Sequence, residues 1–245
     1  MQSEGEQLMP TQFDGFPPEA LEFLYELTQN NNKAWFDANK ERYKRTIVAY
    51  APAFAAALGE RLKSGVSPDI VYDVRTNGAG SMMRIYRDTR FSKDKTPYKT
   101  NVAFLFWEGA RKKMENPSFG FQFGDFGAGL YAGIFRFPKE TLAAYRDAVV
   151  DDKMGPALED AIVAVKRAGD YEIEGLHYKR TPRGYDADHP RAELLRHNGL
   201  HAYSPKFDIQ LVTTPEIIDI CYEHCRNMAP LQQWLVRLER FAKTR

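Results

Sequence analysis

Residues 119–137 read FGFQFGDFGAGLYAGIFRF and carry the pattern that decides the fold. Phe119, Phe121 and Phe123 alternate with glycine or glutamine, and residues 129–137 repeat this period of two. Such alternation is typical of strands that bury one face, and the glycines after Phe123 indicate a turn between two strands. Consecutive short strands without long intervening helices predict an antiparallel or mixed central sheet, and therefore an α+β fold.

Other strands are expected on both sides of this stretch. The segments rich in β-branched and aromatic residues are 70–74, 83–86, 101–107, 171–173 and 200–203. Together with the Phe-Gly stretch they supply the central sheet. Because the pattern changes from helical to alternating only after residue 65, the sheet is expected to follow an N-terminal helical layer.

Both ends of the chain show helical periodicity. Leu21, Leu24 and Leu27 recur at helical spacing after Pro17, and Asn30–Asn32 is expected to end this helix and cap a second one. Further helices are expected around 54–62, at 138–150, 154–167 and 191–197, and from about 214 to 241 with a kink at Pro230. The sequence thus predicts a long C-terminal helix, a flexible tail over residues 1–12 and a single domain over residues 13–245.

The composition is that of a globular protein with a sizeable core. The 245 residues are 43% hydrophobic and 13% aromatic, which excludes a disordered chain. No apolar run is long enough for a transmembrane helix, and the acidic start of the chain lacks the features of a signal peptide. The two cysteines, Cys221 and Cys225, cannot form a disulfide framework, so a cytoplasmic location without membrane association is expected.

The net charge of +1 conceals a strong asymmetry along the chain. Residues 1–26 contain six acidic residues and no Lys or Arg, whereas residues 84–113 contain nine basic and three acidic residues. A local excess of this size creates a positive potential that attracts anions even when the whole protein is nearly neutral.

The densest part of the basic segment is residues 84–100, which are expected to bind an anion. Guanidinium groups suit bidentate contacts with phosphate or carboxylate, and lysines supply mobile charge. A stiff Pro- and Gly-containing loop at residues 181–190 could close over the anion and add a cation to the site. The predicted anion-binding residues are Arg84, Arg87, Arg90, Lys93, Lys95, Tyr98, Lys99 and Arg183.

Four side chains in these segments are candidate general acids or bases, namely Asp88, Asp94, Asp186 and His189. A carboxylate or imidazole near a bound phosphate is what proton transfer requires, so phosphoester hydrolysis is the reaction class that these residues would serve. The ligand expected from this pattern is a small phosphate- or carboxylate-bearing molecule. No nucleotide-binding glycine loop and no cofactor motif is present, and no cofactor is predicted.

Two other interpretations of the basic segment stay open. The same cations, with aromatic neighbours such as Tyr86 and Phe91, could bind a nucleic acid through its phosphates and bases. Alternatively, Asp88 and Asp94 could pair with the arginines in a structural ion network of a non-catalytic interaction protein. An open basic surface would favour nucleic acid, and a closed cleft would favour a small anion.

Two weaker patterns concern metals. Asp186 and Asp188 could hold a divalent cation only if a third carboxylate approached them, and Asp188 is equally suited to a helix N-terminus. Cys221, His224 and Cys225 share one helical face, but a zinc site needs a fourth ligand and the same face is apolar. Core packing is therefore the favoured role of the two cysteines, and no metal site is predicted.

Four ordered motifs resemble one known family. They are Phe13–Pro17, Asn30–Phe36, Arg84–Thr100 and Pro182–Pro190, and the similarity continues to about Leu238. The chain resembles the bacterial and fungal "domain of unknown function 2461" family, which implies a single α+β domain and supplies neither a reaction nor a cofactor. Family members often have a lysine where this chain reads Arg196-His197-Asn198-Gly199, so a ligand role for that lysine would pass here to Arg196 or His197.

Overall fold

The computed structural model describes residues 13–243, and the expected tail at residues 1–12 lies outside this range. The helices are α1 (Pro18–Gln29), α2 (Lys33–Tyr43), α3 (Ala51–Gly65), α4 (Lys139–Val150), α5 (Met154–Arg167) and α6 (Ile217–Lys243). The strands are β1 (Asn101–Trp107), β2 (Ser118–Gly124), β3 (Gly127–Ile134), β4 (Glu172–Leu176) and β5 (His197–Tyr203). The protein therefore has the predicted α+β fold.

The five strands form one antiparallel sheet in the order β1-β2-β3-β5-β4. The predicted alternation sets its two faces. Phe121 lies opposite Phe104 of β1 and Leu130 of β3, and all three side chains are buried. The intervening positions, such as Gly120 and Gly129, belong to the opposite face, because successive residues of a strand alternate between its two faces.

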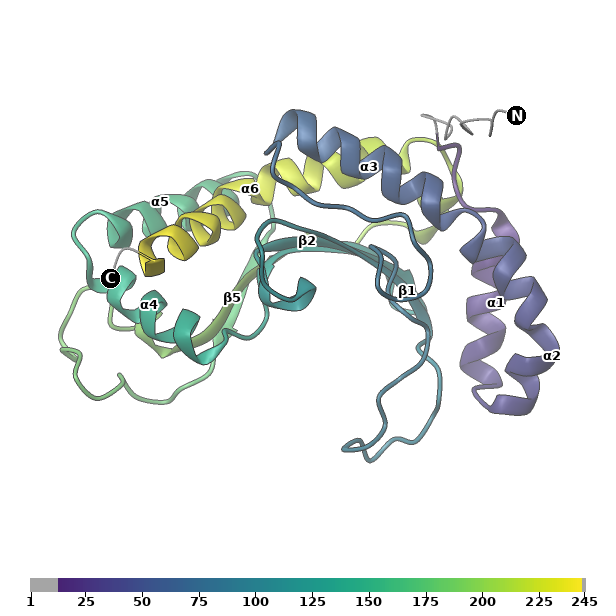
Figure 1. The fold of residues 1–245 in the computed structure, drawn as a ribbon, viewed down its shortest axis with the longest axis horizontal. Coiled ribbons are helices and arrows are strands. Elements are labelled where there is room, and N and C mark those ends of the chain that lie inside the picture. Colours follow the sequence, from purple (N-terminus) through teal and green to yellow (C-terminus); the bar gives the residue numbers. More distant parts are fainter. Residues whose placement is uncertain (1–12, 244–245) are drawn as a thin grey trace, which may run out of the picture.

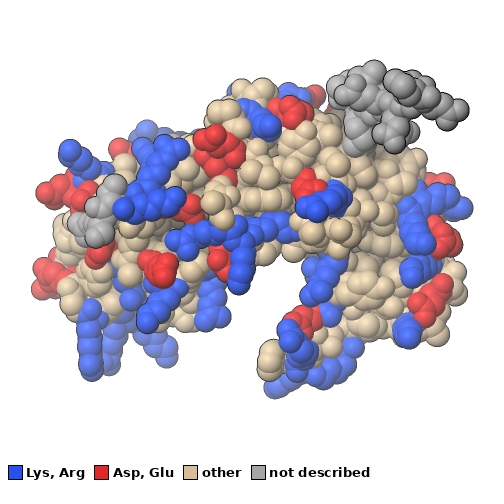
Figure 2. Space-filling view, in the orientation of Figure 1, with Lys and Arg blue, Asp and Glu red and all other residues tan. Residues whose placement is uncertain are grey.

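Helices α3 and α6 lie along one face of this sheet (Figure 1). Phe54 of α3 packs on Phe104 and Phe121, with ring centroids 4.6 and 5.1 Å apart. Helix α6 crosses the same face and packs on α3, α4, α5 and β3. The other face borders a hollow between the part of the molecule that contains α4 and a projecting hairpin (Figures 1 and 2).

Several local expectations are confirmed. Asn32 caps α2, because its side-chain oxygen accepts a hydrogen bond from the backbone N–H of Trp35 at 3.0 Å. The long C-terminal helix α6 continues through Pro230 without interruption. No helix in residues 13–243 combines the length and hydropathy that a membrane span requires.

Other expectations are wrong. The segments 70–74 and 83–86 are not strands. Val71 and Tyr86 within them, and Met82 beside the second, form isolated bridges to Trp107, Tyr98 and Phe104, respectively. A glycine-containing turn, with Gly78 at φ +85°, separates the bridges of Val71 and Met82 and prevents a continuous ladder. The helix expected at 191–197 is reduced to a single 3₁₀ turn at Leu194–Arg196, because His197 already begins β5. Strand β3 ends at Ile134, short of Phe137.

Candidate functional site

Residues 84–100 form a hairpin that projects beyond the sheet from the start of β1, and we call it the cationic hairpin (Figure 1). Two backbone hydrogen bonds close it, from Arg87 N–H to the Pro97 carbonyl at 2.9 Å and from Lys99 N–H to the Ile85 carbonyl at 2.7 Å. Apart from Arg183, the cations predicted from the sequence thus lie on this one element, but their surroundings differ between its base and its tip.

Tyr98 anchors the base of the hairpin in the core. Its ring stacks on Phe36 of α2 at 4.0 Å, and the Asn31 side chain forms hydrogen bonds with both the N–H and the carbonyl of Tyr98. The side chain is 4% exposed, and burial raises the pKa of its hydroxyl. Although predicted to contact an anion, Tyr98 therefore positions the hairpin.

Two arginines near the tip are paired within the hairpin. Arg90 makes two hydrogen bonds to Asp88, at 2.9 and 2.7 Å, and Arg87 contacts Asp94 and Thr96. The Arg90 side chain lowers the pKa of Asp88 to about 2, and the Thr96 N–H together with Arg87 lowers that of Asp94 to about 2. Carboxylates with such low pKa values are weak proton acceptors at neutral pH, which argues against Asp88 and Asp94 as general bases.

The base of the hairpin holds a different group of cations. Arg84 is exposed, Lys99 is half-buried, and in residues 13–243 neither side chain has a carboxylate within salt-bridge distance. Lys113, which follows β1, reaches the same region and donates to the carbonyls of Gly80 at 2.6 Å and Gly78 at 3.3 Å. We call Arg84, Lys99 and Lys113 the stem cluster.

The positive charges of the stem cluster repel one another. Burial lowers the pKa of Lys99, and the charge of Arg84 lowers it further. Burial also lowers the pKa of Lys113; Asp73 partly offsets this effect, and Lys99 adds to it. The sequence pattern did not single out Lys113, although this residue lies in the basic segment 84–113, because its approach to Lys99 depends on the return of the chain after β1.

The loop at residues 178–190 lies on the other border of the hollow, beside α4, so it does not cover the cationic hairpin (Figure 1). Arg183 is exposed on this loop. Asp186 accepts a hydrogen bond from the Asp188 N–H at 2.9 Å, and His189 Nδ1 accepts one from the Arg191 N–H at 3.1 Å. The eight predicted anion-binding residues are therefore divided between two separate borders, which carry Lys and Arg on both sides (Figure 2).

The described residues contain no group of three or more His, Cys, Asp or Glu side chains placed to hold a metal ion. Cys221 and Cys225 are free and buried in α6, and burial raises the pKa of both thiols. His224 shares a 2.8 Å hydrogen bond with Tyr171. The two cysteines therefore belong to the core, and His224 is half-buried beside them.

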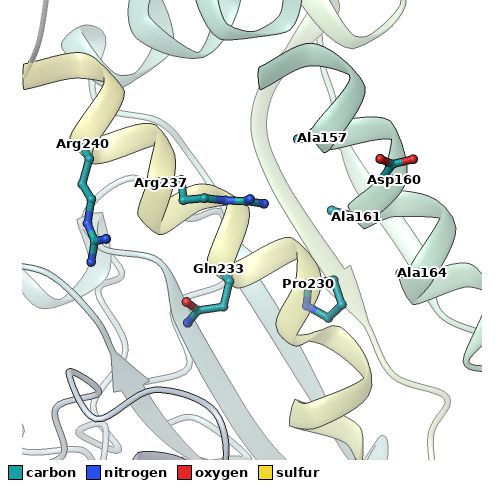
Figure 3. A pocket seen from close by; sticks show the side chains of 8 residues that line it. All are labelled: Ala157, Asp160, Ala161, Ala164, Pro230, Gln233, Arg237 and Arg240. Carbon is teal, nitrogen blue, oxygen red and sulfur yellow. The ribbon is translucent and has the colours of Figure 1, made fainter. Parts of the chain in front are cut away.

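A groove of about 600 Å³ lies between α5 and α6, away from every predicted site residue. Alanines of α5 and Pro230 form much of its lining, and Figure 3 shows Arg237 extended toward α5 while Arg240 points away from it. Among the described residues, no nucleophile with an adjacent base lines this groove. It therefore offers no arrangement for catalysis.

Two buried histidines of β5 should make stability depend on pH. Burial lowers the pKa of both His197 and His201, and nearby carboxylates, including Glu174 beside His201, only partly offset this. Below about pH 6.5 the unfolded chain then binds more protons than the folded one, so stability is lost as the pH falls. We expect the free energy of unfolding, measured in urea, to decrease from pH 7.5 to 5.5.

The variant His201→Gln separates this effect from general acid sensitivity. It removes one titrating group and should flatten the decrease between pH 7.5 and 5.5, a range above the usual carboxylate pKa values. A variant with the full wild-type slope would contradict the prediction.

The comparisons with known proteins place the chain in a family. A family model described as "Conserved hypothetical protein (DUF2461)" matches residues 19–234. No curated protein matches the chain. The match spans α1 to the middle of α6 and thus includes the cationic hairpin, the stem cluster and the whole sheet. The chain belongs to the DUF2461 family of conserved hypothetical proteins.

Proposed function

We propose that the protein binds a small phosphate- or carboxylate-bearing molecule at the stem cluster. The observation that supports this proposal is the proximity of Arg84 and Lys99, two like charges without a carboxylate partner among the described residues. Asp88, which also senses the charge of Arg84, is already bound by Arg90. An anion between Arg84 and Lys99 would remove their repulsion and form charge-assisted hydrogen bonds.

The proposal is one of binding, and it assigns no turnover step to this site. Asp88 and Asp94 are held by arginines, and the loop that carries Asp186 and His189 lies on the far border of the hollow (Figure 1). None of these four is therefore favoured as a proton donor or acceptor for an anion at the stem cluster. The proposed binding calls for no cofactor, and the two free, buried thiols support a reducing cytoplasmic location.

Thermal unfolding in the presence of small anions tests the proposal. The panel contains orthophosphate, sulfate, nucleoside monophosphates, sugar phosphates and citrate. An anion at about 100 times its Kd stabilises the folded state by about 2.7 kcal/mol, which raises Tm on the order of 5–10 °C in a chain of this size. The double variant Arg84→Gln/Lys99→Met is expected to lose this increase.

The melting temperature of the double variant without ligand, compared with that of wild type, is a second criterion. Because Arg84 and Lys99 repel each other, the double variant without ligand is expected to melt at the same temperature as wild type or higher. A matched control, Arg90→Gln/Lys95→Met, removes two charges from the tip and should keep the anion effect. If no anion stabilises the wild type and the stem variant melts several degrees lower, the stem cluster is structural.

A second candidate function is supported by Phe91. This side chain is 95% exposed at the hairpin tip, and the Arg90 guanidinium lies 5.9 Å from its ring centroid. An exposed ring beside cations can stack on a base of a single-stranded nucleic acid. Fluorescence anisotropy with a labelled oligothymidine would then show weaker binding for Phe91→Ser by about 5- to 100-fold, with the small-anion effect unchanged. Equal binding of both proteins would exclude this role of Phe91.

A further inference from the structure

A cavity of about 520 Å³ lies on the open face of the sheet, toward the edge opposite the cationic hairpin. Its lining includes residues of β2, β3, β5 and β4, in the order in which these strands pair. The hairpin and the stem cluster contribute nothing to the lining. The cavity is therefore a separate site whose ligand does not depend on the function proposed above.

The charge of this cavity is the reverse of that at the stem cluster. Asp170, Glu172 and Glu174 line it, and within residues 13–243 no Lys or Arg lies within salt-bridge distance of these carboxylates. Lys206, the lysine among the described residues of the lining, places its ammonium over the Phe126 ring, 5.5 Å from the centroid. The cavity thus contains three carboxylates and one cation that does not neutralise them.

His201 lies behind this wall and leaves the charge of Glu174 uncompensated. Its Nε2 is 3.6 Å from the Glu174 carboxylate, and its side chain is more than nine-tenths buried. Burial lowers its pKa, so the ring is neutral at pH 7. Its Nδ1 has no hydrogen-bond partner among the described residues.

Aromatic rings form another part of the wall. Phe126 is partly exposed in the β2–β3 turn, and Tyr203 extends from β5 next to Glu174. Gly129 leaves the floor open, since a Cβ atom at this position would have only Ser204 Oγ within 4 Å, at 3.7 Å. Carboxylates beside aromatic faces attract ammonium groups through ion pairing and cation–π contact. The position of Lys206 over Phe126 shows that this ring already contacts one ammonium group.

We propose that this cavity binds an aliphatic di- or triamine, whose ammonium groups contact Asp170, Glu172 and Glu174 while its chain lies against Phe126 and Tyr203. Three carboxylates match two or three positive charges better than one, and the volume exceeds what a single ammonium group fills. The Ser204 hydroxyl already accepts from the Leu130 N–H and donates to the Pro205 carbonyl, so ligand selection rests on charge.

Isothermal titration of the full chain at pH 7.5 and low salt tests this proposal with putrescine and spermidine. The uncharged isostere 1,4-butanediol serves as the control ligand. Both amines are expected to bind with one-to-one stoichiometry, spermidine more tightly, and butanediol is expected not to bind. Equal heats from butanediol and putrescine, or the absence of saturable amine binding, would overturn the proposal.

Three variants locate the site. Glu172→Gln/Glu174→Gln should weaken amine binding at least 10-fold, and Phe126→Leu about 2- to 5-fold. Gly129→Leu fills the cavity without a change of charge and should block binding, which keeps the test valid if the double variant fails to fold. The matched control Glu19→Gln/Asp152→Asn removes two exposed acidic charges elsewhere and should bind as wild type does. If this control weakens binding as much as the site variants, the interaction is diffuse and the proposal fails.

Discussion

Replacement of Trp234 by alanine is expected to lower the free energy of unfolding by about 3–5 kcal/mol. Trp234 is fully buried in α6, where its ring meets Tyr145 of α4 edge-on at 6.0 Å. Its Nε1 donates to the Met154 carbonyl at the start of α5, at 3.0 Å. The variant leaves a cavity among three helices and an unpaired carbonyl, since neighbouring helices relax only partly into such a space.

Urea unfolding measures this loss directly, and thermal melting should show a decrease on the order of 10 °C. Tyr25→Ala provides the control, because this tyrosine of α1 is 69% exposed and its removal should change stability by less than about 0.5 kcal/mol. A loss below about 1 kcal/mol for the Trp234 variant would show that α6 is not anchored through this side chain.

Gly133→Ala is expected to destabilise the protein by about 3 kcal/mol or more. Gly133 has a φ of +132°, which side chains of L-residues rarely allow. An added Cβ would lie 2.2 Å from the Leu200 carbonyl oxygen and 2.7 Å from the His201 Cα, both in the backbone of β5. Strands β3 and β5 would have to move apart where Gly133 pairs with His201. The β3–β5 pairing joins strands β1–β3 to strands β5 and β4, so the whole sheet would be weakened there.

Another glycine of β3 offers a matched control for this prediction. A Cβ on Gly129 would have its nearest neighbour, Ser204 Oγ, at 3.7 Å, which is an ordinary contact distance. Gly129→Ala should therefore cost less than about 1 kcal/mol in the same urea experiment. Similar losses for the two variants would mean that β3 and β5 adjust to a side chain at Gly133.

The basic residues of the hairpin form two groups, one at the tip and one at the base, and variants of the two groups should have different effects on function. Arg87 and Arg90 belong to ion pairs at the hairpin tip, whereas the charge of Arg84 acts on Lys99 and, within residues 13–243, no carboxylate lies within salt-bridge distance of either side chain. Exposed ion pairs contribute little to stability. Variants that remove charge at the tip should therefore change the shape of the tip and its contact with nucleic acid. Variants that remove charge at the base should change the binding of small anions.

Local features of this protein could be predicted from its sequence because they depend on neighbours along the chain. The alternation of Phe119, Phe121 and Phe123 determined which face of the sheet is buried, since side chains in a strand alternate with a period of two. The cap at Asn32 involves only the next three residues. The α+β class followed from the order of such segments.

Only the tertiary structure decided which cations share a site. The loop at residues 178–190, which carries Arg183, lies on the border of the hollow opposite the cationic hairpin (Figure 1), and Lys113 approaches Lys99 through the return of the chain after β1. The acidic cavity was also absent from the sequence analysis, because Phe126, Glu172 and Tyr203 come from distant segments that meet only when β3, β5 and β4 pair. Such contacts depend on strand order, which a period along the chain does not encode.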